Sequence, residues 1–243
     1  MAPPRYRLNP ALDQARLARD FRDRERLHIP NFLVPEDAEE LLAALEASHA
    51  WKLIRNEGER VVELDRQAQA SLPAEQRARL VAAVFEGARH GFQYCYETIK
   101  APHGDSDRAA DPTPLNAFAR FLSSPEVIAF LRAVTGHDDI TFADAQATAY
   151  GPRHFLTAHD DLAPKQKRRV AYVFNLTKHW PVDWGGLLTF HDDRSSVVEA
   201  LVPAFNALNL FAVPQPHSVS FVTPFAARRR YSVTGWLRAG TPP

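Results

Sequence analysis

After Gly136 the chain becomes a succession of short β-rich runs separated by turns, and this texture limits the fold more than any other feature. The runs lie near 139–151, 153–159, 169–177, 186–191, 196–201, 206–212, 217–223 and 229–238. Eight short strands with connections of unequal length favour a double-sheet jelly roll over a parallel sheet. Helical periodicity precedes Gly136, so the predicted class is α+β, with N-terminal helices buttressing one face of the barrel.

We expect a single domain over residues 1–243, in which 1–136 form a helical lead-in and support and 137–239 form the jelly-roll core. Helices are predicted to start at Asn9-Pro10, at Pro35 and at Pro73, the last running towards Tyr96, and to cover 114–122 and 125–135. Short strands are predicted at 27–33 and 51–64. Residues 101–113 lack periodicity and are predicted to be a polar loop.

The composition limits the kinds of partner and the location that we expect for this chain. Lys+Arg equals Asp+Glu, so the formal net charge is zero, which argues against a direct nucleic-acid or membrane-surface partner. The first residues lack the apolar core of a signal peptide, and no run of ~18 apolar residues is present. The one cysteine, Cys95, has no partner for an internal disulfide, so we expect a reducing, cytoplasmic location.

Two His-x-Asp triplets stand in the strand-rich half: His159-Asp160-Asp161 and His191-Asp192-Asp193. Residues i and i+2 of a strand share a face, so either triplet could chelate a metal together with a distant histidine, for which His217 is the candidate. Two histidines and one carboxylate occupy one face of an octahedral Fe(II) and leave the other positions for substrate and dioxygen.

The distance along the chain to His217 favours the first triplet. In a jelly roll, several strands separate the paired ligands from the distal one. Fifty-seven residues lie between His159 and His217, which is room for about four strands, whereas the 25 residues between His191 and His217 leave room for about two. The second triplet, followed by Arg194-Ser195, is typical of a polar hairpin tip. The predicted metal ligands are therefore His159, Asp161 and His217.

Three arginines in a row, Arg228, Arg229 and Arg230, precede the last predicted strand. Such a run is usually a solvated turn, but Arg230 enters the strand Tyr231–Trp236. A guanidinium matches a carboxylate in a bidentate manner, and such a pair is stronger inside a partly dry barrel than at the surface. Arg230 is therefore the candidate clamp for the carboxylate of a co-substrate.

The C-terminal half resembles the Fe(II)/2-oxoglutarate-dependent dioxygenases, and among them the prolyl-hydroxylase-like branch. The resemblance runs through residues 146–237 in order and includes the turn at Tyr150-Gly151-Pro152, His159-x-Asp161, the Gly185-Gly186 start of a strand, Pro203 to Phe211, Pro216-His217 and Arg230 to Trp236. The lead-in, with Ile29-Pro30-Asn31-Phe32-Leu33, is similar to that of enzymes that hydroxylate a proline in a ribosomal protein.

The resemblance implies that the cofactors are Fe(II), the co-substrate 2-oxoglutarate and O2, with ascorbate as a candidate reductant. Arg230 would pair with the 5-carboxylate of 2-oxoglutarate, and Tyr150 would line its pocket, although Tyr150 is equally typical of a core aromatic. Asn175 stands where prolyl hydroxylases often have a second pocket tyrosine. The His217-to-Arg230 spacing of 13 is longer than usual, so either the loop 224–227 bulges or Arg228 is the clamp.

The same resemblance implies hydroxylation of a C–H bond with release of succinate and CO2. We expect the target to be a prolyl residue of a protein or peptide. Hydroxylation of a free amino acid or other metabolite is the alternative. A non-catalytic jelly roll with a structural metal is less favoured, because structural sites are normally closed whereas this ligand set leaves positions open.

Overall fold

The computed structural model describes residues 6–242, and its helices lie mainly in the first 135 residues. The helices are α1 (Gln14–Arg24), α2 (Pro35–Ala47), α3 (Arg66–Ser71), α4 (Ala74–His90), α5 (Asp105–Ala110), α6 (Pro114–Leu122) and α7 (Pro125–Thr135), with 3-10 turns η1 (Pro164–Gln166) and η2 (Val182–Trp184). No helix within this range is both long and apolar enough to cross a membrane.

The strands form a single antiparallel sheet that curls on itself. They are β1 (Arg26–Pro30), β2 (Lys52–Glu57), β3 (Arg60–Asp65), β4 (Tyr94–Lys100), β5 (Ile140–Ala143), β6 (Gln146–Tyr150), β7 (Phe155–His159), β8 (Arg168–Asn175), β9 (Leu188–His191), β10 (Val197–Leu201), β11 (Ala207–Ala212), β12 (His217–Val219) and β13 (Arg230–Ala239). Their order is β1-β11-β8-β13-β6-β4-β7-β12-β9-β10, with β2 and β3 added beside β4 and β5 beside β13.

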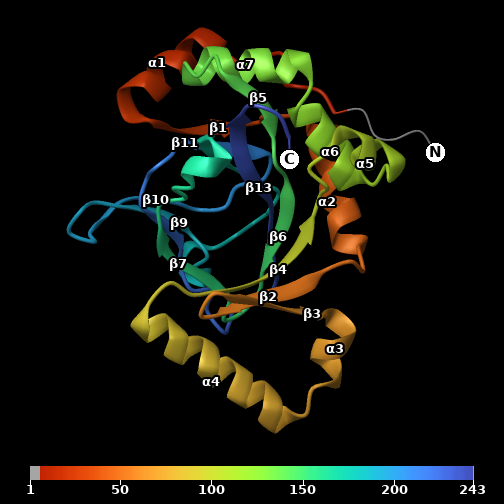
Figure 1. Cartoon of the computed structure of the whole chain (residues 1–243), viewed down its shortest axis with the longest axis vertical. Coiled ribbons are helices and arrows are strands. Elements are labelled where there is room, and N and C mark those ends of the chain that lie inside the picture. The colour runs from red at the N-terminus through yellow and green to blue at the C-terminus, as the bar shows by residue number, and fades with distance from the viewer. Residues whose placement is uncertain (1–5, 243) are drawn as a thin grey trace.

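This order is a jelly roll in an α+β chain, as predicted from the sequence. Strands β5 to β13 supply the eight expected runs, since the first run is divided into β5 and β6. Strand β4 pairs with both β6 and β7 and so joins the two halves of the curled sheet. Figure 1 shows α1 and α7 above this sheet, α2, α5 and α6 along one side, and α4 beneath it.

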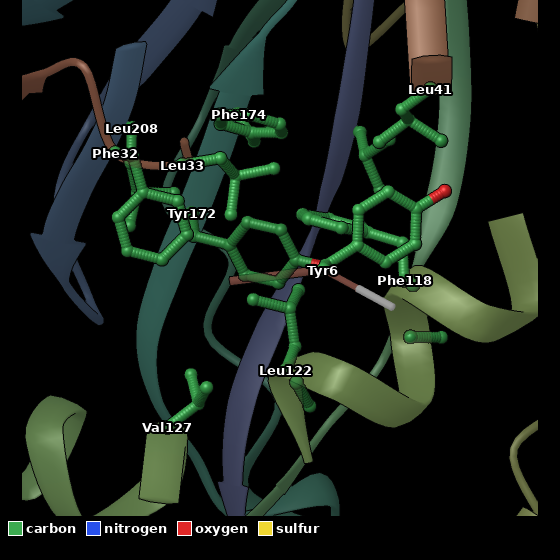
Figure 2. Close-up of a cluster of buried hydrophobic side chains, with 14 of the residues drawn as sticks. Tyr6, Phe32, Leu33, Leu41, Phe118, Leu122, Val127, Tyr172, Phe174 and Leu208 are labelled. Atoms are coloured by element: carbon green, nitrogen blue, oxygen red, sulfur yellow. The ribbon is translucent and has the colours of Figure 1, made fainter. Parts of the chain in front are cut away.

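The helices pack against the sheet through an aromatic and aliphatic core (Figure 2). The Phe118 ring on α6 stacks on Phe174 of β8 at 5.2 Å between centroids and meets Tyr6 edge-on at 5.4 Å. Asn206 fixes the chain after β1, because its side chain accepts from Leu33 N and donates to Leu33 O. The N-terminal segment therefore packs against β8 and against the start of β11.

Helix boundaries follow the capping residues where these are clear. Thr113 and Ser124 cap α6 and α7 with their hydroxyls, each helix begins with proline, and Gly136 ends α7 in the left-handed region. The predicted start at Asn9-Pro10 is wrong: Asn9 caps only a turn, and α1 begins after Asp13, whose carboxylate accepts from Arg16 N.

Two further predictions in the lead-in are wrong. The helix from Pro73 stops at His90, and Tyr96 lies on β4. Gly91 ends the helix because its backbone is extended, and the chain then reverses into the strand. Residues 101–113 are not all loop, since they contain α5, a helix of six residues too short to show a periodic pattern.

Candidate metal centre

A cavity of about 350 Å³ lies inside the curled sheet and is lined from both of its halves. Its walls come from β2, β3, β4, β6, β7, β8, β9, β11, β12 and β13. A volume of this size is typical of a small-molecule or cofactor site.

His159, Asp161 and His217 lie together in this cavity. Strands β7 and β12 pair in antiparallel register with His217 opposite His159, and Asp161 follows two residues after His159. Nε2 of His159 lies 3.6 Å from Asp161 Oδ1, and Nε2 of His217 lies 3.5 Å from Asp161 Oδ2. One donor atom from each residue therefore falls within 4.8 Å of the others, which fits a single metal ion.

The other nitrogen of each histidine is occupied. His159 Nδ1 lies 3.0 Å from Thr157 O, and His217 Nδ1 lies 2.8 Å from Gln215 O. A carbonyl oxygen can only accept, so each Nδ1 carries the hydrogen and each Nε2 has a free lone pair. Burial lowers the pKa of His217 to about 4, so this imidazole is neutral at neutral pH, as a metal ligand must be.

Arg168 holds the backbone beside the carboxylate. Asp161 has a φ of 62°, and Arg168 Nη1 donates to its carbonyl oxygen at 3.0 Å. The Arg168 guanidinium lies 3.4 Å from the centroid of the Trp236 ring, so the arginine is itself held in place by a cation–π contact. This arrangement keeps Asp161 turned towards the two histidines.

Arg230 is the buried cation of the same cavity. Its residue is 1% exposed, Nη1 donates to Gly186 O at 2.7 Å, and Nη2 makes only a long 3.4 Å contact with Asn175 Oδ1. Its Nε has no partner, and Arg230 makes no ion pair with any carboxylate among residues 6–242. Burial lowers its pKa to about 10, so the side chain stays cationic at neutral pH and fits an incoming carboxylate.

The Gly185-Gly186 pair sets the backbone that meets this arginine. Both glycines have positive φ, and Gly186 carries the carbonyl that Arg230 bonds. A Cβ added to Gly185 would lie 2.0 Å from the carbonyl oxygen of Phe221, so the backbone there would have to move.

We therefore expect Gly185→Ala to destabilise the fold. Gly185 has φ 68° and ψ −146°, a conformation that is essentially restricted to glycine and that costs an alanine about 1–3 kcal/mol, and the clash with Phe221 adds about 1–3 kcal/mol. Gly58→Ala is the matched control, because Gly58 also has a positive φ (60°) but a Cβ there meets nothing within 4 Å. Urea unfolding of both variants measures the difference, and equal losses of unfolding free energy would contradict this account of Gly185.

The other predicted pocket residues lie around the arginine. Tyr150 lines the cavity, its ring centroid lies 5.4 Å from Arg230 Cζ, and it stacks on Tyr96 at 4.9 Å. Asn175 is not among the lining residues; it contacts Arg230 and sends its amide to Val173 O and Ala207 O. Arg228 is exposed, with its guanidinium 5.9 Å from the Trp184 ring.

The second His-x-Asp triplet lies outside the cavity. His191 ends β9, and its Nε2 hydrogen-bonds with the hydroxyls of Thr189 and Ser218. Asp193 is exposed in the turn that follows. This placement agrees with the polar turn expected for the triplet.

Several residues that line the cavity were not predicted from the sequence. Phe92 and Tyr96 were predicted to lie in the helix that starts at Pro73, and Tyr94 was not named as a site residue. Tyr94 and Tyr96 line the cavity from β4, and Phe92 is half exposed beside His159. The alternation of Tyr94, Tyr96 and Thr98 with Cys95, Glu97 and Ile99 after Gly91 is the signal of a strand that would have found them. Arg168 and Lys100 carried no such signal.

Residues 145–238 match the profile of the 2OG-Fe(II) oxygenase superfamily. The match covers the part of the chain that holds His159, Asp161, His217 and Arg230. It agrees with the expected enzyme class, a 2-oxoglutarate-dependent dioxygenase, and with the expected cofactors, Fe(II), 2-oxoglutarate and O2. The buried donor set and the unpaired Arg230 described above fit that metal and that dicarboxylate.

The chain is also similar to individual prolyl hydroxylases. It is 31% identical over 125 residues to mouse prolyl 3-hydroxylase OGFOD1, a match that covers 49% of this chain and 22% of the mouse protein. The chain thus spans about a fifth of that relative's length.

Two solved structures share the fold. The Pseudomonas putida prolyl-4-hydroxylase superposes with a TM-score of 0.59 at 18% identity, covering 93% of this chain and 99% of its own. A Trichoplax adhaerens prolyl hydroxylase, solved in complex with a peptide fragment of the hypoxia inducible factor oxygen degradation domain, gives 0.59 at 16% identity, with 93% and 89% covered.

Proposed function

We propose that this protein is a 2-oxoglutarate-dependent hydroxylase that acts on a prolyl residue of a protein or peptide. The reaction converts a substrate C–H bond, 2-oxoglutarate and O2 into a C–OH bond, succinate and CO2. In this proposal His159, Asp161 and His217 hold the iron, and Arg230 holds the far carboxylate of 2-oxoglutarate.

The observation that carries the proposal is the presence of two complementary sets of groups in one cavity. Three donors suited to Fe(II) lie at one place, and a buried cation without a carboxylate partner among residues 6–242 lies at another. A buried arginine with a free Nε is costly unless an anion arrives. A metal site alone would give no reason for that cation.

The protein's own groups would bind the metal and the co-substrate and orient them. Nε2 of His159, Nε2 of His217 and the Asp161 carboxylate would hold the metal, while Thr157 O and Gln215 O keep the two imidazoles in one tautomer. Arg230 would take the co-substrate carboxylate with its Nε and Nη2 while Nη1 stays on Gly186 O. When bound, Fe(II) and 2-oxoglutarate supply the oxidising power, which no side chain of the chain can provide.

The prolyl target is supported by the relatives rather than by a contact. The mouse relative is named a prolyl 3-hydroxylase, and the structural neighbours are named prolyl hydroxylases, one of them with a bound peptide. The rim of the cavity supports a peptide as well. Phe92 is 50% exposed and Val61 49% exposed, and both line the cavity, so an apolar surface is available outside it.

Hydroxylation of a small molecule is the second candidate. It is favoured by the cavity volume of about 350 Å³, which accommodates a metabolite beside the co-substrate. The single buried Cys95 supports a reducing cytoplasm as the location in either case, where Fe(II) is easier to maintain.

The test is succinate formation. The protein is purified without oxygen, supplied with Fe(II) and 2-oxoglutarate, and exposed to air with and without proline peptides. Peptides with alanine in place of proline are the matched controls, and mass spectrometry of the peptide locates the added oxygen. Stimulation by proline peptides alone supports the prolyl target. Succinate that no peptide stimulates favours the small-molecule candidate, and no succinate despite bound iron contradicts the catalytic proposal.

A further inference from the structure

A second hollow, of about 440 Å³, lies between α4 and the sheet and shares no lining residue with the metal cavity. Figure 1 shows α3 and α4 beneath β2 and β3, and residues of α3, α4, β2 and β4 line the hollow. Strand β4 is the wall between the two spaces. Tyr94 and Tyr96 line the metal cavity, whereas Cys95 and Glu97 line the second hollow. Alternate side chains of one strand thus serve two separate sites.

The hollow lies under a helix that buries little of its surface. Near its C-terminus, Gly87 leaves space for Gln93, whose side chain would lie 2.2 Å from a Cβ at that position. Val84 is the only fully buried residue of this seventeen-residue helix. Leu80 and Val81, nearer the N-terminal end, face the hollow and remain partly exposed. Protein interiors are normally close-packed, so an apolar helix face over an open space is suited to a ligand.

The charges around the hollow are predominantly positive. Arg66, Arg77, Arg153 and Arg229 line it, and Glu97 is the one carboxylate among its lining residues. Glu97 is already occupied, since it accepts two hydrogen bonds from Arg66 and one from Arg229.

The remaining two arginines are available. Arg77 donates to the carbonyl of Leu72, and neither Arg77 nor Arg153 lies within ion-pair distance of a carboxylate in residues 6–242. An apolar wall and two free guanidinium groups therefore border the same space. That combination matches a ligand with an apolar body and a single anionic head.

We propose that the hollow under α4 is a second binding site, which takes a small monocarboxylic acid with an apolar chain or ring. The apolar part lies against Leu80, Val81 and Val84, and the carboxylate meets Arg77 and Arg153. The site does not depend on the proposed hydroxylase activity, because it uses none of the residues of the metal cavity.

The test compares three probes of equal chain length by isothermal titration calorimetry on the full chain. Octanoate is expected to bind saturably with one-to-one stoichiometry, octanol more weakly, and octylammonium not measurably. Arg230→Gln is tested with octanoate as well, because Arg230 is the other buried cation that could attract a carboxylate. If Arg230→Gln binds octanoate as the wild-type protein does, the acid is assigned to the second hollow. If this variant no longer binds octanoate, the proposal is overturned.

Variants of the hollow complete the test. Arg77→Gln with Arg153→Gln is expected to weaken octanoate about tenfold, as two partly exposed ion pairs would, and to leave octanol unchanged. Arg79→Gln is the matched control, since Arg79 lies on the same helix, does not line the hollow and pairs with Glu75. Val81→Trp, which fills the hollow from a partly exposed position, is expected to abolish binding. Equal binding of octanoate and octylammonium, or full affinity in the double variant, overturns the proposal.

Discussion

Asp161→Ala is expected to lower succinate formation at least about 100-fold, because changes that only reorient metal ligands already cost 10- to 100-fold. Asp161 is the only anionic donor of the three, and it lies between the two imidazoles at 3.6 and 3.5 Å from their Nε2 atoms. Without its carboxylate, two neutral imidazoles would face a divalent cation alone. Both the affinity for Fe(II) and the geometry of the open positions should therefore be lost.

The measurement pairs metal content with turnover. Iron bound per chain is determined after anaerobic gel filtration, and succinate is measured under saturating Fe(II). His191→Ala is the matched control, because His191 belongs to the same kind of His-x-Asp triplet but binds the hydroxyls of Thr189 and Ser218 outside the cavity. This control is expected to keep most of its activity. Wild-type turnover in Asp161→Ala, or equal losses in both variants, would contradict the assignment of the ligands.

The jelly roll was accessible from the sequence because its strands are short, apolar and separated by turn residues. The first triplet was chosen over the second by the length of chain to His217, and the register of β7 against β12 is what that length makes possible. Spacing could identify the triplet, but not the tautomers of the histidines, which depend on the carbonyls of Thr157 and Gln215.

The N-terminal helices and strands were harder to predict from the sequence, because a helical and a strand pattern overlap in the same residues. The stripe of α4 continues in spacing through Phe92 and Tyr96, so helical periodicity did not reveal the reversal at Gly91. Residues 94–100 form a strand because they pair with β2, β6 and β7, which are distant in the sequence. Helical periodicity therefore placed Tyr96 of the aromatic wall in a helix, although the alternation after Gly91 indicates a strand.

The long spacing between His217 and Arg230 has a structural explanation. Residues 220–229 fold across the β6–β7 turn, where Arg153 N donates to Val222 O and Val222 N donates to His154 O. The extra residues project outward, with Phe225 66% exposed. Arg230 stays in register opposite Tyr150, so the insertion does not displace it from the cavity.

Arg230→Gln is expected to raise the Michaelis constant for 2-oxoglutarate about 100-fold or more. Arg230 is buried without a carboxylate partner in residues 6–242, so in the variant the far carboxylate of the co-substrate would be buried with no cation beside it. Removing one partner of a buried ion pair costs about 3–5 kcal/mol, which corresponds to at least about 100-fold in affinity. Arg228→Gln, at an exposed position two residues earlier, is the control and should leave the constant within about threefold.

A second co-acid separates loss of the clamp from general damage to the site. 2-Oxopentanoate has a methyl group where 2-oxoglutarate has its far carboxylate, so it gains nothing from a cation in the cavity. The wild-type protein should therefore prefer 2-oxoglutarate strongly, and Arg230→Gln should lose most of that preference while still binding iron. A variant that keeps the preference would show that another residue holds the carboxylate. If Arg228→Gln loses the preference instead, the clamp lies in the loop before β13, and the buried Arg230 must serve the packing around Gly186 and Asn175.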